Sequence, residues 1–473
     1  MMSFVFNFFI IVVVFSILII VHEFGHFLAA RLSGVKVTHF SIGFGPVLLK
    51  KKIKQTNLLI CAFPLGGFIK MAGDSRSESR GYRDEFFSKS PGIRSRIVFA
   101  GPLFNYILAF LMLAVVATIG YSVQDTVVGA VEKGSPAQQA GIQRGDKVVA
   151  VGDKKVESWS KLQTEIYQAK DSINLSLERN GNELNLKIPV EEKEITNKLG
   201  RETKVSQIGI SAYGPVIGEI IEDYPAQQAG LKKGDKILEV NGKSVESWKD
   251  LAERIQNSKD FVSLKIKREE KVFSLKVPVK KEEFKNLKSG KEYISVIGIR
   301  PFSKDKILKV GFPGSLGKGV KMLFRTTALS VKGLWYMITD PSISFRESVA
   351  GPIYISYIIS KTAELGFVAL LQLMSLLSIF LFVINLLPIP VFDGGHIVFF
   401  GIEKLRGSPL SQKTEDTANR IGLALIIVLM FFVFYNDIVK RGPKIWKEIK
   451  SSFNQEGEQL EIKKIQEESN EKN

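Results

Sequence analysis

Four long apolar stretches divide the chain into membrane-type and polar parts. In the first, at residues 4–30, no charged side chain occurs between Val5 and Val21. The others lie at residues 97–121, 366–390 and 421–439. A run of about 20 mainly apolar residues is long enough for a helix to cross the hydrocarbon core of a bilayer. We therefore predict four transmembrane helices. The first is expected to be retained, because it lacks the basic start and cleavage site of a signal peptide.

A polar region with an internal repeat separates the second and third apolar stretches. The sequence PAQQAG at residues 136–141 recurs 89 residues later, and the GDK and VESW segments that follow it recur at the same offset. Repetition at a fixed offset indicates a duplicated domain. Alternating apolar and polar residues after each copy are typical of strands. We predict two α+β domains, at residues 122–195 and 205–282.

Three further segments complete the predicted organisation. The loop at residues 31–96 carries thirteen Lys and Arg against four Asp and Glu, which favours the cytoplasmic side and an N-terminus outside. Within this loop, residues 61–71 are expected to form a hairpin, either associated with the membrane or simply buried. Residues 316–340 have an apolar and a basic face, as an amphipathic helix at the membrane surface does. The tail at residues 454–473 is expected to be disordered.

The net charge of +17 changes this picture little. Basic residues flank the apolar stretches instead of gathering on one domain, so nucleic acid is not an expected partner, whereas the lipid bilayer is. Four crossings from an outside start put the C-terminus outside, although the basic residues after the last stretch favour the cytoplasmic side. The single cysteine, Cys61, excludes an intrachain disulfide and a zinc site built from cysteines.

The first apolar stretch ends in the sequence His22-Glu23-Phe24-Gly25-His26. On a helix His22 and His26 lie one turn apart on the same face, so both rings can bind one metal ion, and Glu23 is near enough to accept a proton from metal-bound water. The alternative is a pair of hydrogen-bonded core histidines. Ionisable side chains are costly in a membrane, which favours the metal site. A zinc site needs a third protein ligand from elsewhere.

The third apolar stretch is broken where a carboxylate follows it. Pro388 and Pro390 end the helix, and Asp393 comes next, followed by Gly394 and Gly395. Proline stops a helix and a glycine pair lets the backbone turn, so the side chain of Asp393 can point back among the helices. Asp393 is the best candidate for the third ligand.

These segments resemble the site-2 proteases, and the repeated domains resemble the PDZ domains of the bacterial regulator-of-sigma-E branch of that family. The resemblance is carried by HEFGH, by the sequence NLLPIPVFDGG at residues 385–395, and by the order of the segments. It implies a polytopic α-helical membrane protein with about four transmembrane helices, two inserted PDZ-like α+β domains and a membrane-associated β-loop. Phe392 stands where the family usually has leucine, an exchange of one apolar residue for another. Gly101 and Asn105 match a pattern in the family's second helix.

The resemblance also implies roles for individual residues. His22, His26 and Asp393 would bind Zn²⁺, Glu23 would be the catalytic base, and Asn385 would lie near the scissile peptide. The β-loop would hold an extended substrate, and the PDZ-like domains would bind peptide C-termini or extended segments, or exclude large substrates. The implied location is the bacterial inner membrane, with the active site toward the cytoplasm and the PDZ-like domains on the periplasmic side.

Three functions are compatible with these features. The first is an intramembrane zinc endopeptidase that cuts single-span membrane proteins, such as an anti-sigma factor. The second is a catalytically silent membrane scaffold that presents two peptide-binding domains. The third is a membrane-anchored zinc protease that acts on soluble or misfolded proteins. The intact HEFGH sequence and Asp393 favour an enzyme over the scaffold. The position of HEFGH at the end of an apolar span favours an intramembrane site over a soluble one.

Overall fold

The computed structural model describes residues 2–196, 202–286, 290–340, 348–443 and 446, in two compact units. The first unit contains the chain up to Tyr121 and from Lys309 onward, and the second runs from Ser122 to Leu308. The tail expected to be disordered at 454–473 lies outside the described residues.

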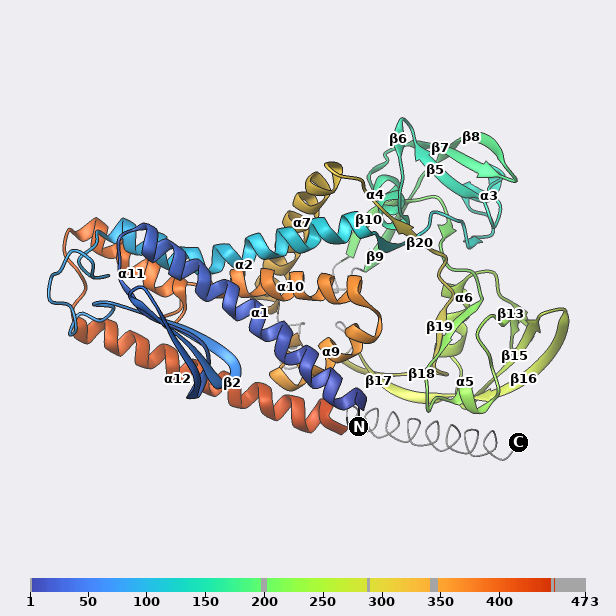
Figure 1. Ribbon diagram of the computed structural model, residues 1–473. Coiled ribbons are helices and arrows are strands. Elements are labelled where there is room, and N and C mark those ends of the chain that lie inside the picture. Colours follow the sequence, from blue (N-terminus) through green and yellow to red (C-terminus); the bar gives the residue numbers. More distant parts are fainter. Residues whose placement is uncertain (1, 197–201, 287–289, 341–347, 444–445, 447–473) are drawn as a thin grey trace, which may run out of the picture. The chain divides into compact units, whose positions relative to one another are not determined.

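The first unit is mainly helical (Figure 1). Its helices are α1 (Met2–Leu32), α2 (Pro91–Ile119), α7 (Gly314–Thr339), α9 (Pro352–Glu364), α10 (Phe367–Asn385), α11 (Asp393–Arg406) and α12 (Gln412–Asn436), and a π-helical turn, η1 (Asp437–Arg441), follows α12. In the described part of the chain, α1, α2, α10 and α12 are the helices long and apolar enough to cross a membrane. The four predicted transmembrane helices are therefore confirmed.

Two of these helices begin more than a turn earlier than their apolar stretches predict. Helix α2 begins at Pro91 instead of residue 97, and α12 begins at Gln412 instead of residue 421. Proline is well suited to the first turn of a helix, and the Ser411 side chain caps α12 by accepting a hydrogen bond from the N–H of Thr414. Hydrophobicity marks only the lipid-facing part of a helix, so polar first turns were not included in the predicted ranges. Helices α9 and α11 were not predicted.

Helices α1, α2 and α10 pack against one another and form the centre of this unit. Val14 and Leu18 of α1 are buried in one cluster with Met112 of α2 and Met374 of α10. Closer to the HEFGH sequence, α1 and α2 approach so tightly that a Cβ atom on Gly25 would lie 2.3 Å from the carbonyl oxygen of Ala100. Small residues allow such close approach of membrane helices. The glycine of HEFGH therefore brings α2 directly against the histidine-bearing turn.

Helix α7 has a packed face and an exposed apolar face. Leu323 is buried against α2 and α10, and the Thr327 hydroxyl donates a hydrogen bond to Tyr106 on α2 at 3.2 Å. Phe324, Trp335 and Ile338 are between 63% and 72% exposed. An exposed row of large apolar side chains beside basic residues is the pattern of a helix in contact with lipid headgroups.

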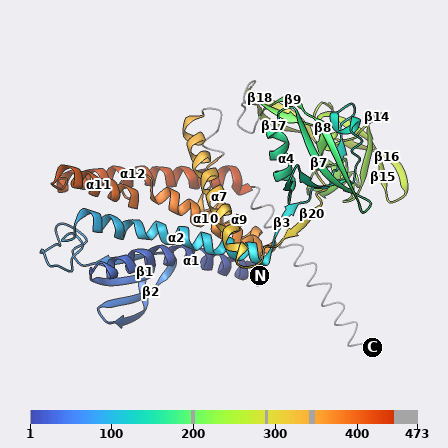
Figure 2. The ribbon, with the colours of Figure 1, turned by 90° about the horizontal axis from the view of Figure 1, so that it is seen from above.

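The loop between α1 and α2 forms a compact sheet beside α1 (Figure 2). It consists of β1 (Val37–Ile53) and β2 (Thr56–Met71), which pair antiparallel. The first part of β1, residues 37–42, pairs on one side with residues 57–60 and on the other with residues 67–71. The hairpin expected at 61–71 therefore extends over 37–71 as two bent strands. In the described part of the chain, residues 67–71 pair with a strand on one side only.

The second unit contains the two repeats, each built on a four-stranded antiparallel sheet. The first repeat has β4 (Ala130–Val131), α3 (Pro136–Gln139), β5 (Lys147–Val151), β6 (Lys154–Lys155), α4 (Trp159–Gln168), β7 (Ser172–Arg179), β8 (Asn182–Pro189), β9 (Glu191–Thr196), β10 (Glu202–Gln207) and β11 (Ile210–Ser211). The second has β12 (Ile217–Ile220), α5 (Pro225–Gln228), β13 (Lys236–Val240), β14 (Lys243–Ser244), α6 (Trp248–Gln256), β15 (Phe261–Arg268), β16 (Lys271–Pro278), β17 (Lys280–Asn286), β18 (Gly290–Val296) and β19 (Ile299–Pro301). Strands β3 (Tyr121–Gln124) and β20 (Asp305–Leu308) pair where the chain enters and leaves this region.

Each repeat contains an ion pair between a buried aspartate and a partly exposed arginine. In the first, the Arg179 guanidinium donates two hydrogen bonds to Asp146, both 2.7 Å long, and Arg268 does the same to Asp235 in the second at 2.7 and 2.8 Å. Burial by itself would raise the pKa of Asp146. Its hydrogen bonds with Arg179 and with the N–H of Gln143 nevertheless hold that pKa below the ordinary value. The pair ties the GDK turn to the neighbouring strand.

Each repeat ends later than its sequence-based boundary. Strand β11 pairs with β4, and Ile208 is buried in the first core, so the first repeat continues past residue 195. Likewise β19 pairs with β12, and Ile297 is buried in the second core, which extends that repeat past residue 282. The closing strand returns to the first strand of its repeat after a long hairpin. Local patterns cannot reveal such a pairing between distant parts of the chain.

Candidate active site

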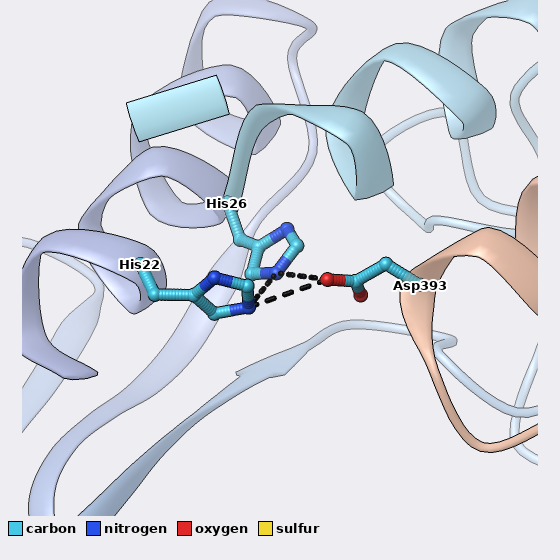
Figure 3. Close-up of side chains that lie close together, drawn as sticks. All are labelled: His22, His26 and Asp393. Carbon is cyan, nitrogen blue, oxygen red and sulfur yellow. Dashed lines mark hydrogen bonds and ion pairs between the residues drawn. The ribbon is translucent and has the colours of Figure 1, made fainter. Parts of the chain in front are cut away.

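Three predicted site residues meet at one point in the helical unit. Figure 3 shows His22 and His26 of α1 and Asp393 of α11 with their side chains directed toward one another. Nε2 of His22 lies 3.2 Å from Nε2 of His26 and 3.3 Å from Oδ2 of Asp393, and Nε2 of His26 lies 3.6 Å from the same oxygen. The three side chains are between 11% and 18% exposed. The two histidines, four residues apart on α1, and the distant aspartate thus form one cluster.

Asp393 reaches this cluster because of the turn before it and the glycines after it. Val391 has a φ of 87°, a strained conformation for a β-branched residue, and Asp393 is the first residue of α11. A Cβ atom on Gly394 would lie 2.4 Å from the carbonyl oxygen of Leu387, and one on Gly395 would lie 2.4 Å from that of Ile389. The glycine pair therefore lets the first turn of α11 fold tightly onto the end of the preceding segment.

Helix α2 packs against the back of both histidines. Nδ1 of His26 lies 2.9 Å from the carbonyl oxygen of Ile97, so it donates a hydrogen bond there and leaves Nε2 facing the cluster. Gly101, one turn on, leaves room for the ring: a Cβ atom there would lie 2.2 Å from Nε2 of His26. Asn105, a further turn on, is fully buried with its amide Nδ2 3.4 Å from Nδ1 of His22. Residues four apart share a helix face, so one face of α2 supports the site.

The cluster fits a zinc ion. Zinc prefers four ligands in a tetrahedron, with histidine nitrogens and carboxylate oxygens at about 2.0–2.2 Å, which places any two ligand atoms about 3.3 Å apart. The three separations here are 3.2, 3.3 and 3.6 Å. Among the described residues, one group of side chains is arranged so that it could hold a metal ion. It consists of His22, His26 and Asp393. With these three side chains as ligands, the fourth position would be open, as catalytic zinc sites require.

Glu23 lies between the histidine turn and the sheet. A Cβ atom on Gly67 of β2 would lie 3.3 Å from Cγ of Glu23, so this side chain passes over the strand at its glycine. The backbone N–H of Ile69, two residues further along β2, also lies near the Glu23 carboxylate. The Glu23 side chain, next to the histidines of HEFGH, therefore lies against residues 67–71 of β2.

Asn385 is not joined to this cluster by a direct contact. It is the last residue of α10 and is half-buried. Among the described residues, no hydrogen bond links its side chain to His22, His26 or Asp393. Asn385 and Asp393 instead lie at opposite ends of the turn that follows α10, so Asn385 remains a predicted substrate-side residue.

A buried charge cluster anchors the far end of α11. Glu403 accepts a 2.5 Å hydrogen bond from Arg94 of α2 and a 3.3 Å one from Arg76, which also donates to Glu415 of α12. Arg94 is only 2% exposed. Ion pairs buried to this degree resist separation, because each charge left alone would lack its partner. The helix that begins with Asp393 is therefore fixed to α2 and α12.

Sequence reasoning singled out Gly101 and Asn105 of α2 as matches to a family pattern, but it did not connect α2 with the histidines. Ile97 acts through its backbone carbonyl group, which has no side-chain signature. The charges of Arg94 and Glu403 are 309 residues apart, and no local pattern connects them. One signal was available in the sequence. Ile97, Gly101 and Asn105 are spaced four residues apart in an apolar helix, so the small and the polar residue lie on one face.

The chain was compared with known proteins. The profile of peptidase family M50 matches residues 10–429. The regulator of sigma-E protease of Escherichia coli is 32% identical over 456 residues, covering 92% of this chain and 99% of that protein. The Haemophilus influenzae protein named regulator of sigma E protease is 31% identical, covering 93% of this chain and all of that protein. A solved PDZ domain from Listeria innocua is 29% identical, covers 19% of this chain and 92% of that domain, and has a TM-score of 0.15.

The family match extends over the whole site and both repeats. It runs from the first apolar helix, through the PDZ-like region, to the last apolar helix. With four apolar helices and relatives of this kind, the protein is a multi-pass protein of the bacterial inner membrane. The recognition made from HEFGH and the Asp393 segment is confirmed, and the chain belongs to peptidase family M50 as a membrane zinc metallopeptidase.

Proposed function

We propose that this peptidase cuts single-span membrane proteins within their transmembrane segments, with His22, His26 and Asp393 as zinc ligands. The observation that carries the proposal is the convergence of these three side chains at the end of an apolar helix. A site among membrane-spanning helices favours substrates that already lie in the bilayer. A zinc ion held there would supply a Lewis acid that polarises a carbonyl group and activates water.

In this proposal Glu23 moves the proton. Its carboxylate follows His22 directly on α1 and lies against Gly67 of the sheet, so it faces the space where an extended peptide would run. It would accept a proton from the attacking water and pass it to the leaving amine. Asn385, at the end of α10, is proposed to donate a hydrogen bond to the substrate carbonyl oxygen as negative charge develops there.

The sheet edge formed by residues 67–71 is proposed to hold the substrate. A transmembrane helix satisfies its own backbone hydrogen bonds, so it must unwind before its peptide bonds can be attacked. Among the described residues, 67–71 pair with β1 on one side only, and the segment lies beside Glu23. An unwound substrate strand could pair with this edge and recover hydrogen bonds that it lost on unwinding.

The position of the site in the bilayer is proposed from charge and length. The basic loop that follows α1 favours the cytoplasmic side, so HEFGH would lie near that side and the PDZ-like repeats would lie in the periplasm. The first repeat has a groove between α4 and residues 207–211, lined by Trp159, Gln163, Ile208 and Ser211 among others. This groove supports a role in binding peptide ends or extended segments of substrates, such as an anti-sigma factor.

The test compares wild type with Glu23→Gln in liposomes that contain a single-span test substrate. The variant keeps the size of Glu23 and one acceptor oxygen, but its amide cannot accept the proton from water. We expect wild type to cut within the span, and Glu23→Gln to bind one zinc ion per chain without cutting. Zinc is measured on both purified proteins. If neither protein cuts any of a panel of spans and wild type binds no zinc, the proposal fails and the scaffold alternative takes its place.

A further inference from the structure

Asn105 of α2 meets His22 on the side of the ring that faces away from the cluster. Nε2 of His22 points at His26 and Asp393, at 3.2 and 3.3 Å. Its other nitrogen, Nδ1, lies 3.4 Å from the side-chain amide of Asn105. Asn105 is 0% exposed, and it lies on an apolar helix where an unpaired amide is costly.

The chemistry of a metal ligand determines what Nδ1 of His22 requires. A histidine that offers the Nε2 lone pair to a metal carries its proton on Nδ1, and this N–H needs an acceptor. For His26 the acceptor is the carbonyl oxygen of Ile97 at 2.9 Å. Ile97 and Asn105 lie on the same face of α2, two turns apart. The group in the corresponding place for His22 is therefore the amide of Asn105.

Asn105 can accept this hydrogen bond when its amide oxygen, and not its amino group, faces His22. Its Oδ1 has no hydrogen-bond partner in the described part of the chain, while the amino group faces Nδ1 of His22. The two branches of the amide have nearly the same shape, so a half-turn exchanges them. The exchange puts Oδ1 opposite Nδ1, where it accepts the proton that a metal-binding His22 presents.

Asn105 is itself tied to a third helix through its backbone. Its backbone carbonyl oxygen accepts a 2.8 Å hydrogen bond from the hydroxyl of Ser378 on α10. Ser378 is 0% exposed. This bond fixes the α2 turn that carries Asn105 against α10. A continuous set of buried contacts thus leads from α10 through α2 to the ring of His22.

We propose that Asn105 is a positioning residue of the metal site. Its amide oxygen accepts a hydrogen bond from Nδ1–H of His22 and thereby fixes the ring orientation and the tautomer that presents Nε2 to the zinc ion. The inference rests on the proposed role of His22 as a ligand. Asn105 does not touch the substrate or the metal. Its effect should appear first in metal affinity, because partners of this kind change affinity by about 10–100-fold.

The test measures zinc affinity by competition with a chromophoric chelator, using the purified full-length protein in detergent. Asn105→Leu keeps the approximate size and removes the acceptor, and Asn105→Ala is a second variant that also removes it. Asn105→Asp has oxygen on both branches, so it can accept from Nδ1 in either orientation. Ser375→Ala is the matched control: Ser375 is also buried in this helix bundle, and its hydroxyl bonds within α10.

We expect zinc affinity to fall about 10–100-fold in Asn105→Leu and Asn105→Ala, and to stay within about threefold of wild type in Asn105→Asp and Ser375→Ala. A purely structural role of Asn105 would lower the melting temperature and leave affinity unchanged in whichever variants fold. Wild-type affinity in Asn105→Ala or Asn105→Leu would overturn the inference. If His22→Ala binds zinc as tightly as wild type does, the proposed metal site itself fails, and the two failures are thus distinguished.

Discussion

Replacing Gly101 with alanine should disable the site by moving His26. A Cβ atom at this position would lie 2.2 Å from Nε2, 2.5 Å from Cε1 and 2.7 Å from Cδ2 of the His26 ring. Ordinary contact begins near 3.4 Å, so the ring must move by about 1.2 Å. The ring cannot simply tilt away, because its Nδ1 is bonded to the Ile97 carbonyl oxygen on the same helix.

The expected size of the effect follows from how precisely a site must be built. Functional groups must be held within about 0.5 Å of their productive positions, and a displacement of about 1 Å costs about 100-fold in rate. By this measure Gly101→Ala should lower the cleavage rate about 100-fold. This corresponds to an activation free energy that is higher by about 2.7 kcal/mol. The helix itself should not suffer, since alanine is a better helix former than glycine by about 1 kcal/mol.

The assay measures cleavage of a single-span substrate in liposomes, together with zinc per chain and the melting temperature. Gly92→Ala is the matched control, because Gly92 lies in the first turn of the same helix and no atom lies within 4 Å of an added Cβ. We expect full zinc content and cleavage in Gly92→Ala, and loss of both in Gly101→Ala with a monodisperse, folded protein. Wild-type zinc content and cleavage in Gly101→Ala would refute the placement of His26 as a ligand.

Three further predictions concern the charge cluster, the first repeat and the metal. Glu403→Gln should destabilise the protein in detergent by about 3 kcal/mol in thermal unfolding, because it leaves the buried Arg94 without its charged partner; an unchanged melting temperature would contradict this. Asp146→Asn should destabilise the repeat at pH 7. Because folding lowers the pKa of Asp146, the stabilisation is present above the ordinary aspartate pKa and is lost as pH falls through the lower folded value, so the difference in melting temperature from wild type should vanish in strong acid. Chelation should abolish cleavage, and added zinc should restore it; activity that survives complete removal of zinc would exclude a metal mechanism.

The sequence by itself determined the parts of this protein that depend on neighbouring residues. Apolar length is a property of each segment, so α1, α2, α10 and α12 could be located as membrane helices. The spacing of His22 and His26 places them on one helix face whatever surrounds them, because the helix period is fixed. The offset of 89 residues likewise reveals two copies of one domain without a structure.

Only the tertiary structure decided how the distant parts meet. Asp393 lies 371 positions after His22, and its approach depends on the strained turn at Val391 and on the glycines that let α11 fold back. The closing strands β11 and β19 pair with β4 and β12 across whole repeats, so the domain ends could not be read locally. The Ile97 carbonyl group and the buried amide of Asn105 acquire their places only when α2 packs on α1. Hydrogen bonds and burial between distant segments are set by packing, and packing is the property that a local pattern does not contain.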